Sequence, residues 1–139
     1  MPNPISLIAG GDVRPARFVK LSTAADFTVL EADANERTYG ISIDAYQDAP
    51  IPSNTNGYAA SAGQSLRMYG IGDECTLTLG SGGATRGDKL KSDADGKGVA
   101  AATTGATMQW VGAEALESGL EGEKIKVRIS QYPHYPALT

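Results

Sequence analysis

Residues 85–99, TRGDKLKSDADGKGV, contain two motifs whose residue types could carry out a recognised chemistry. The first is Arg86-Gly87-Asp88, the tripeptide that integrins bind. The second is the cluster of Asp93, Asp95 and Gly96, in which two carboxylates and a glycine resemble the start of a calcium-binding loop. One motif would make the chain an adhesion ligand, and the other would make it a metal-binding protein.

The spacing around Asp93 does not fit a calcium loop of the EF-hand type. Such a loop has oxygen ligands at positions 1, 3 and 5, glycine at position 6 and glutamate at position 12. A loop that starts at Asp93 has Gly96 at position 4, Lys97 at position 5 and Thr104 at position 12. An Asp-Gly pair between two short strands instead favours a hairpin turn, so we expect a turn over residues 93–97.

Few other residues could support catalysis or hold a metal. The chain has one cysteine, Cys75, and one histidine, His134, so it offers no disulfide within the chain and no cysteine-based zinc site. A Ser-His-Asp set would depend on His134 alone, close to the C-terminus. We therefore expect no catalytic residues, no metal and no cofactor. Cys75 is predicted to be a small buried residue, and Trp110 to lie in the core.

Charge and hydropathy exclude two classes of partner. The formal net charge is −4, and acids and bases are mixed along the chain without a basic patch, so we expect no nucleic acid partner. The apolar runs are too short to span a bilayer, and the N-terminus MPNPISLIAGG has neither the basic region nor the apolar core of a secretory signal. These features predict synthesis in the cytoplasm and no membrane partner.

The elements that must position these residues are predicted to be short β-strands. Residues 124–130 alternate strictly, with Ile125, Val127 and Ile129 on one face. Residues 74–79 repeat this pattern. Further strands are predicted at 17–21, 39–43, 65–71 and 108–112, while 113–117 could be a short helix or the end of a strand. With seventeen glycines separating such strands, we expect an all-β fold, either a compact barrel or a sandwich.

The chain also repeats itself, which predicts two similar halves packed face to face. Four segments of the first half match segments of the second in the same order: 17–22 with 86–91, 28–30 with 98–100, 39–43 with 110–114, and 63–68 with 122–127. The first half carries an insertion at about residues 45–62. We expect an N-terminal arm over residues 1–11, one β domain over 12–131 and a C-terminal tail over 132–139.

The second half resembles a known family. The segment GDKLKSDADGKGVAAATTGATMQWVGAEALESGLEGEKIKVRIS is similar to the C-terminal half of the capsid cement, or decoration, proteins of tailed bacteriophages. The shared motifs are a Gly-Asp before a strand, a DADGK turn, a VGxAxE segment and a final alternating strand. They fall here at 87–88, 93–97, 111–114 and 122–129. The first half fits more loosely, through FVKLS, YGISIDA and GDECTLTLG.

This resemblance covers about residues 12–131, and the insertion and both termini depart from it. It implies a β-rich fold, no catalysis and attachment to the outside of a phage head, often as a homotrimer. The implied partner is the major capsid protein, and the implied location is the outer surface of the virion after synthesis in the host cytoplasm. Gly87 and Asp88 then fall on a strand-entry turn, where glycine takes a conformation that other residues resist and the aspartate binds backbone amides. Arg86 is incidental on this interpretation.

A cement protein of this kind would act by binding alone. A protein that bridges shell subunits and binds only their mature arrangement shifts the equilibrium toward the closed shell by mass action. A trimer presents each contact three times, and linked contacts bind more tightly than a single one. The acidic character of the chain suits an outer surface better than one that faces packaged DNA.

Three segments outside the predicted core are candidate contacts with the capsid or with other subunits. Each combines prolines, which favour an extended chain, with large apolar or aromatic side chains. Alternatively, the tail could cover a barrel edge of its own subunit. The candidate residues are Pro2, Pro4, Ile5, Leu7 and Ile8 in the arm, Tyr46, Ile51 and Tyr58 in the insertion, and Tyr132, His134 and Tyr135 in the tail.

Two other functions remain open from the sequence. One is a ligand- or carbohydrate-binding β module, for which Tyr46 and Tyr58 are the candidate aromatic platform. The other is a different structural protein of the phage, in the tail or inside the head.

Overall fold

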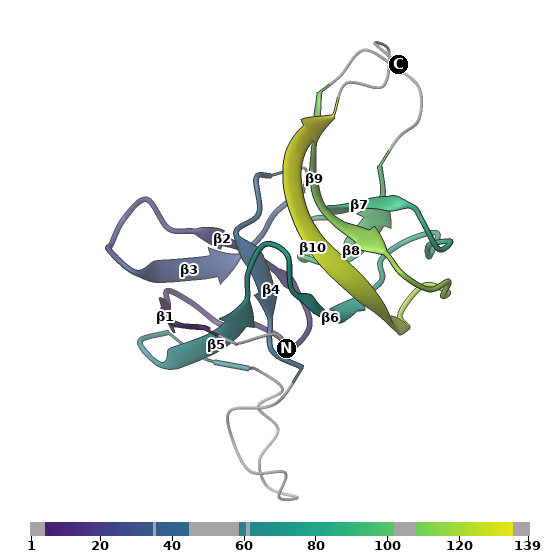
Figure 1. Ribbon diagram of the computed structural model, residues 1–139. Coiled ribbons are helices and arrows are strands. Elements are labelled where there is room, and N and C mark those ends of the chain that lie inside the picture. The colour runs from purple at the N-terminus through teal and green to yellow at the C-terminus, as the bar shows by residue number, and fades with distance from the viewer. Residues whose placement is uncertain (1–4, 35, 45–58, 61, 102–107, 135–139) are drawn as a thin grey trace, which may run out of the picture.

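The computed structural model describes residues 5–34, 36–44, 59–60, 62–101 and 108–134, and within these ranges the chain is all-β, as expected. Figure 1 shows its ten strands. Their bounds are β1 Ile5–Ala9, β2 Phe18–Leu21, β3 Thr28–Glu31, β4 Gly40–Ser42, β5 Ser65–Tyr69, β6 Glu74–Thr78, β7 Lys89–Ser92, β8 Gly98–Ala100, β9 Gln109–Ala115 and β10 Lys124–His134.

The strands form two units with the same topology, which confirms the prediction of two similar halves. The first unit is a closed barrel in the order β1-β3-β2-β4-β5, with β5 pairing back to β1. The second is a five-stranded sheet in the order β6-β10-β9-β7-β8. The neighbours of each strand in the second unit therefore match those of the strand five positions earlier, except that β6 and β8 lie at opposite edges of the open sheet. A single parallel bridge between Leu79 and Gly98 stands where β1 pairs with β3 in the first unit.

Matching backbone hydrogen bonds confirm that these are two copies of one unit. In the first unit, Ala9 donates its amide to the Gln64 carbonyl (2.9 Å) and accepts from the Gly63 amide (2.8 Å). In the second unit, Leu79 donates to Glu123 (2.8 Å) and accepts from Gly122 (3.0 Å). The predicted match of 63–68 with 122–127 is therefore right.

The predicted match of 17–22 with 86–91 is wrong by two residues. The turn before β2 contains Ala16 at φ 53°, and the turn before β7 contains Gly87 at φ 87°. Each of these residues lies two positions before its strand, so Arg17 corresponds to Asp88 rather than to Arg86. The repeated letters Arg, Lys and Leu had suggested a register that the turn geometry does not support.

The first unit has its own apolar core, and a second core is shared between the units. The interior of the barrel is built from Ala9, Val13, Val19, Val29, Ala59, Ala60, Leu66 and Met68. The shared core joins the inward residues of β6, β7, β9 and β10 to Phe18 and Ile41, which are fully buried and pair across β2 and β4. A Cβ atom on Gly112 of β9 would come within 2.7 Å of the Phe18 ring, so glycine lets the two units approach closely. Burial of Phe18 alone stabilises this contact by roughly 1.5–3 kcal/mol.

The expectation of an N-terminal arm over residues 1–11 is wrong from Ile5 onward. β1 closes the barrel: Leu7 pairs with Leu66 of β5, and Ile8 pairs in parallel with Thr28 of β3. The inward side of β1 places Leu7 against the barrel core and buries Ala9. A five-residue strand between a proline pair and two glycines carries too little alternation to be distinguished from an extended arm.

The boundary predicted at residue 132 is also wrong, because β10 continues to His134. An irregularity in the pairing between Ile129 and Tyr132 interrupts the alternation that the sequence shows up to Ser130. Ile129 still exchanges backbone hydrogen bonds with Gly72 and Asp73. Beyond it, β10 pairs with β9 alone among the described strands, so Pro133 is tolerated in a strand with one neighbour. The ends of β9 and β10 project together from the body (Figure 1).

The remaining expectations have mixed outcomes. Residues 113–115 belong to β9, so the strand alternative is right and the helix is not formed. Cys75 is buried as expected, with 6% of its surface exposed, but Trp110 is only half-buried and does not lie in the core. The insertion expected at 45–62 ends earlier than predicted, because Ala59 and Ala60 are buried in the barrel core. Residues 45–58 lie outside the described ranges.

Candidate functional site

The Arg-Gly-Asp tripeptide lies in the turn that leads into β7. Asp88 accepts a hydrogen bond from the Thr85 amide on its carboxylate (2.9 Å), and it donates its own amide to the Thr85 carbonyl (2.9 Å). Gly87 has a φ of 87°, a conformation that favours glycine. The expected roles of Gly87 and Asp88 as turn residues are therefore confirmed. The Arg86 side chain is exposed, and its amide donates to the Ser118 hydroxyl (3.0 Å).

The DADGK segment forms the hairpin turn between β7 and β8, as the sequence predicts. Asp93 accepts hydrogen bonds on one carboxylate oxygen from the amides of Asp95 (2.8 Å) and Lys97 (2.9 Å). Gly96 has a φ of 76° and donates its amide to the Asp93 carbonyl (3.1 Å). In the described ranges, no three side chains of His, Cys, Asp or Glu converge as metal ligands do.

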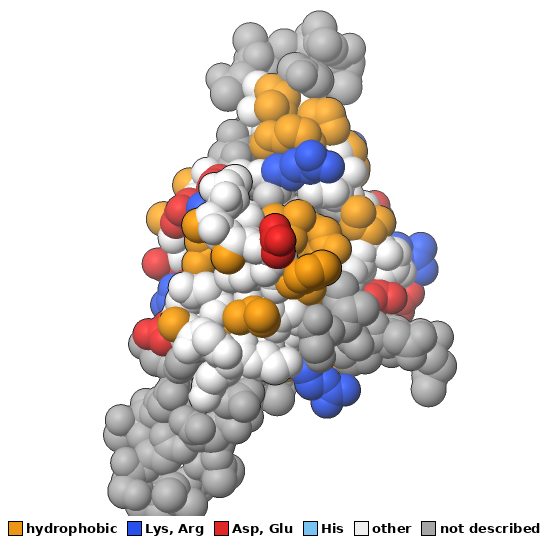
Figure 2. All heavy atoms as spheres, turned by 90° about the vertical axis from the view of Figure 1, so that its left-hand side faces the viewer, with side chains coloured by type: hydrophobic (Ala, Val, Ile, Leu, Met, Phe, Trp, Pro, Cys, Tyr) orange, Lys and Arg blue, Asp and Glu red, His pale blue; other side chains and the backbone are white. Residues whose placement is uncertain are grey.

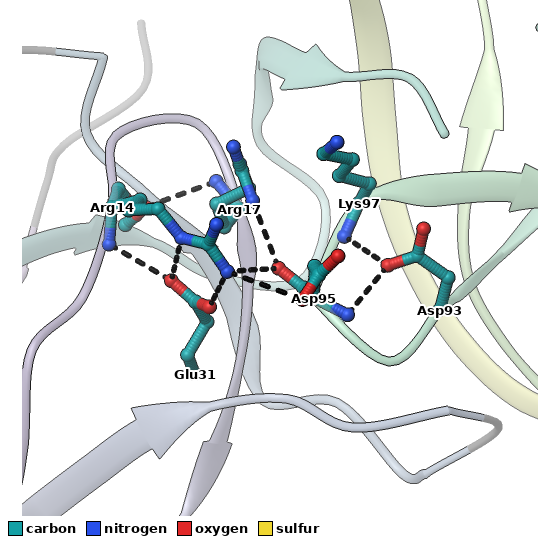
Figure 3. A network of polar contacts seen from close by, with 7 residues as sticks. Arg14, Arg17, Glu31, Asp93, Asp95 and Lys97 are labelled. Carbon is teal, nitrogen blue, oxygen red and sulfur yellow. Dashed lines mark hydrogen bonds and ion pairs between the residues drawn. The ribbon is translucent and has the colours of Figure 1, made fainter. Parts of the chain in front are cut away.

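This turn also joins the two units, a role that its sequence does not reveal (Figure 3). The Asp95 carbonyl accepts hydrogen bonds from Arg17 Nη1 (3.0 Å) and Arg14 Nη2 (3.4 Å) of the first unit. The Gly96 carbonyl accepts from the Phe18 amide (2.7 Å). We call this set of contacts the inter-unit joint. A Cβ atom on Gly96 would lie 3.0 Å from the Phe18 carbonyl, so the close approach requires glycine.

An ion pair fixes the first-unit side of the joint. Arg14 donates from Nε (3.2 Å) and Nη2 (2.5 Å) to the two carboxylate oxygens of Glu31, whose side chain is 16% exposed. Paired hydrogen bonds of this kind are stronger and more directional than an exposed ion pair. The bond to Glu31 raises the pKa of Arg14. Burial, and then the neighbouring Arg14 charge, lower the pKa of Arg17, whose Nε is buried without a hydrogen-bond partner among the described residues.

The candidate contacts predicted near the N-terminus separate into inward and outward residues. Leu7 is half-buried and packs against the barrel core, so it is a structural residue of the monomer. Ile8 points outward, with 45% of its surface exposed. Ile5 pairs with Met68 in the ladder between β1 and β5. Pro2 and Pro4 lie outside the described residues.

The tail candidates that the structure describes lie in β10 rather than in a separate segment. Tyr132 pairs with Val111 and His134 with Gln109 of β9, and both candidates are half-buried. Burial, and next the charge of Glu114, raise the pKa of Tyr132. Three predicted contacts in the insertion and one in the tail fall outside the described residues, namely Tyr46, Ile51, Tyr58 and Tyr135.

The structure adds an exposed apolar face that the sequence analysis did not identify. Figure 2 shows hydrophobic side chains gathered on the side of the molecule that carries the β2–β3 hairpin. The large exposed apolar residues of the first unit and of the turn after it are Ile8, Leu21, Phe27, Tyr39 and Ile71. Phe27 is 76% exposed and has a φ of 54°, which is uncommon for a bulky residue and costs about 1 kcal/mol. Such a concentration of exposed apolar side chains is typical of an interaction surface.

Part of this face is a hollow of about 400 Å³ where the two units meet. We call it the junction hollow. Its apolar lining comes from Leu21, Tyr39 and Ile71, and its charged lining from Lys20, Glu36 and Arg37. These residues come from the end of β2, the segment before β4 and the turn after β5. Alternation within single strands cannot reveal a site that is built from the ends of several elements.

Comparison with known proteins finds a solved structure with a similar fold. The structure is similar to the crystal structure of the head fiber gp8.5 N base of bacteriophage phi29, with a TM-score of 0.60 and 22% sequence identity. The similarity covers 96% of this chain and 100% of that chain. No curated protein matches the chain.

Residues 5–123 match the family of the XM1 gp53 minor capsid protein. This match spans most of the 139 residues, so the chain belongs to the XM1 gp53 minor capsid protein family. The protein is a structural protein of a phage virion that is associated with the capsid. No helix in the described part of the chain is long and apolar enough to span a membrane.

Proposed function

We propose that the protein binds the outside of the phage head and stabilises the mature capsid lattice by bridging major capsid subunits, without catalysing a reaction. Membership of a minor capsid protein family is the observation that carries this proposal. Two further features support it: the exposed apolar face and the net charge of −4, which suits the outer surface better than one in contact with packaged DNA.

The stabilising effect follows from selective binding. A shell under internal pressure from its genome opens by separating its subunits. A protein that contacts two subunits only in their closed arrangement adds its binding free energy to the closed state. If the protein is a homotrimer at a threefold position, each contact is made three times, and the effective concentration of the second and third contacts raises the overall affinity.

The test compares heads assembled with and without the protein. DNA-filled heads from a phage that lacks its gene should bind the purified protein in a co-sedimentation assay to a fixed number of sites per head. Binding should raise the temperature at which the heads release DNA, as followed by a DNA-binding dye. Equal binding to immature shells, or saturated binding without a change in the release temperature, would contradict lattice stabilisation.

A second candidate function is a base that carries a fiber on the head. The observation that favours it is the similarity over the whole of the phi29 head fiber base. Electron microscopy of heads with and without the protein separates the two functions. A base should account for the density from which a thin projection extends, whereas a lattice stabiliser should sit at contacts between shell subunits.

A further inference from the structure

The junction hollow is a preformed feature held in place by contacts on both sides. The Gln131 side chain of β10 donates a hydrogen bond to the Thr38 carbonyl, which fixes the segment before β4 against the second unit. Tyr39 donates its amide to the Val19 carbonyl (2.7 Å), which fixes the same segment against β2. Thr38 itself is buried. Binding in such a hollow requires little reorganisation, so little affinity is lost to ordering.

The two cations at this hollow differ in what they can still bind. Lys20 donates to Glu36 (2.8 Å) and Asp33 (3.1 Å), so its charge is neutralised within the protein. Arg37 lies over the Trp110 ring, with its guanidinium carbon 5.6 Å from the ring centroid, and it forms no ion pair with any residue that the structure describes. Stacking on an aromatic ring uses the face of a guanidinium and leaves its N–H groups available.

An available guanidinium beside an apolar hollow defines the chemistry of the occupant. The planar N–H groups of arginine match a carboxylate, which they bind through two parallel hydrogen bonds. Leu21, Tyr39 and Ile71 offer an apolar surface next to it. We propose that the junction hollow binds a segment of a shell subunit that carries an Asp or Glu side chain beside an apolar one. This inference rests on the proposed function and adds to it the place and the chemistry of the capsid contact.

The dimensions of the hollow favour a segment of the shell over a second copy of this chain. A volume of about 400 Å³ admits a few side chains. A stable contact between two copies needs a flat, self-complementary patch of about 800 Å² on each partner. Each copy also has a net charge of −4, which opposes the approach of a second copy at low salt.

The test is co-sedimentation with DNA-filled heads that lack the protein. Arg37→Gln removes the free charge and should weaken binding at least tenfold, whereas Arg37→Lys keeps the charge without the paired donors and should bind with intermediate affinity. The matched control is Arg86→Gln, since Arg86 is also exposed but lies in the turn before β7. For the apolar lining, Ile71→Ser should weaken binding, and its control is Leu120→Ser, which alters an exposed leucine away from the hollow.

The outcomes separate this inference from the proposed function. If the wild-type protein binds heads and all five variants, at positions 37, 86, 71 and 120, bind equally well, the contact lies elsewhere and the inference fails while the function stands. If the wild-type protein does not bind heads, the proposed function fails. If Arg37→Gln changes the sedimentation coefficient of the free protein but not its binding to heads, a second copy occupies the hollow and the inference is overturned.

A crosslinking experiment identifies the occupant directly. Replacing Ile71 with the photoreactive residue p-benzoylphenylalanine and irradiating the protein on purified heads should join it to one peptide of the major capsid protein. Mass spectrometry of that peptide should show an Asp or Glu within a few residues of the joined position. A crosslink to another copy of this chain, or to a capsid peptide without a carboxylate, would contradict the proposal. The same substitution at Leu120 is the control and should give no capsid crosslink.

Discussion

At the scale of single residues, two features of the sequence that suggested chemistry prove to be structural. Asp88 closes the turn before β7 with two hydrogen bonds to Thr85, and Asp93 closes the β7–β8 hairpin. Local turn chemistry is short-range, which is why the sequence alone predicted both turns. Arg37 and Trp110 meet from different units, 73 positions apart in the chain, so no local pattern could have paired them.

Cys75 gives a prediction about pH. Burial raises the pKa of its thiol from 9.0 to about 12, so the folded state keeps the neutral thiol where the unfolded chain ionises. The stabilisation from this difference is fully present below pH 9 and is lost as the pH rises toward 12. Urea unfolding at several pH values should show the free energy of unfolding falling between pH 9 and pH 12 by up to about 1.4 kcal/mol per pH unit from this group.

The control for this prediction is Cys75→Ala, which lacks the thiol. The variant should be less stable at neutral pH, and its stability should fall less steeply above pH 9. Equal slopes for the two proteins would show that the thiol ionises without unfolding. A second measurement is labelling with a thiol reagent at pH 8, which should be slow in buffer and complete in concentrated urea.

At the scale of elements, the sequence predicted most of the strands but missed β1 and the end of β10. The sequence alternates strictly over residues 74–79 and 124–130, and it placed β6 and the first part of β10 correctly. In β1 the outward residue Ile8 is apolar like its neighbour Leu7, which breaks the alternation, and the irregularity after Ile129 hides the end of β10. The junction hollow was also missed, because strand ends supply its residues and periodicity describes only strand faces.

The place of β1 in the barrel leads to a prediction about Leu7, for which the neighbouring residue Ile8 is the control. Leu7 points toward the barrel core, and its neighbour Ile8 points toward solvent. Leu7→Asn should lower the free energy of unfolding by about 2–4 kcal/mol, because it places a polar side chain against the core. Ile8→Asn should cost less than about 1 kcal/mol. Chemical denaturation followed by circular dichroism measures both values, and the reverse order would mean that β1 pairs in a different register.

At the scale of the whole molecule, the two units are predicted to unfold together. Phe18 and Ile41 belong to the first unit, but they complete the apolar core of the second. Neither unit can therefore lose its fold without exposing apolar surface of the other. The sequence predicted this pairing of two halves from their repeated order, but not the residues that hold them together.

Gly96 tests the joint between the units. Gly96→Ala introduces a Cβ atom 3.0 Å from the Phe18 carbonyl oxygen, and alanine also resists a φ of 76°. The close contact and the backbone strain should both lower the free energy of unfolding. The control is Gly122→Ala, at a φ of 85° and with open space around the new atom. We expect about 1 kcal/mol of destabilisation for Gly122→Ala from the backbone alone and at least about 1 kcal/mol more for Gly96→Ala.

Both variants should still unfold in one transition. Trp110 is the chain's one tryptophan, so its fluorescence reports on the second unit, while circular dichroism reports on both. The two signals should share a midpoint in Gly96→Ala as in the wild type. Separate midpoints would mean that the units unfold independently. Equal stability of the two glycine variants would mean that the inter-unit joint accommodates the added methyl group without lowering the free energy of unfolding.

The closure of the first barrel within the first half of the chain has a consequence for synthesis on the ribosome. Its last strand ends at Tyr69, whereas Gly112, which covers Phe18, is translated 43 residues later. At typical elongation rates of about 5–20 residues per second, this interval is about 2–9 s. During that time the barrel can already close, with the outward-facing Phe18 and Ile41 exposed to water. A nascent chain in which the barrel has closed would carry an uncovered apolar side, which is the kind of surface that ribosome-associated chaperones bind.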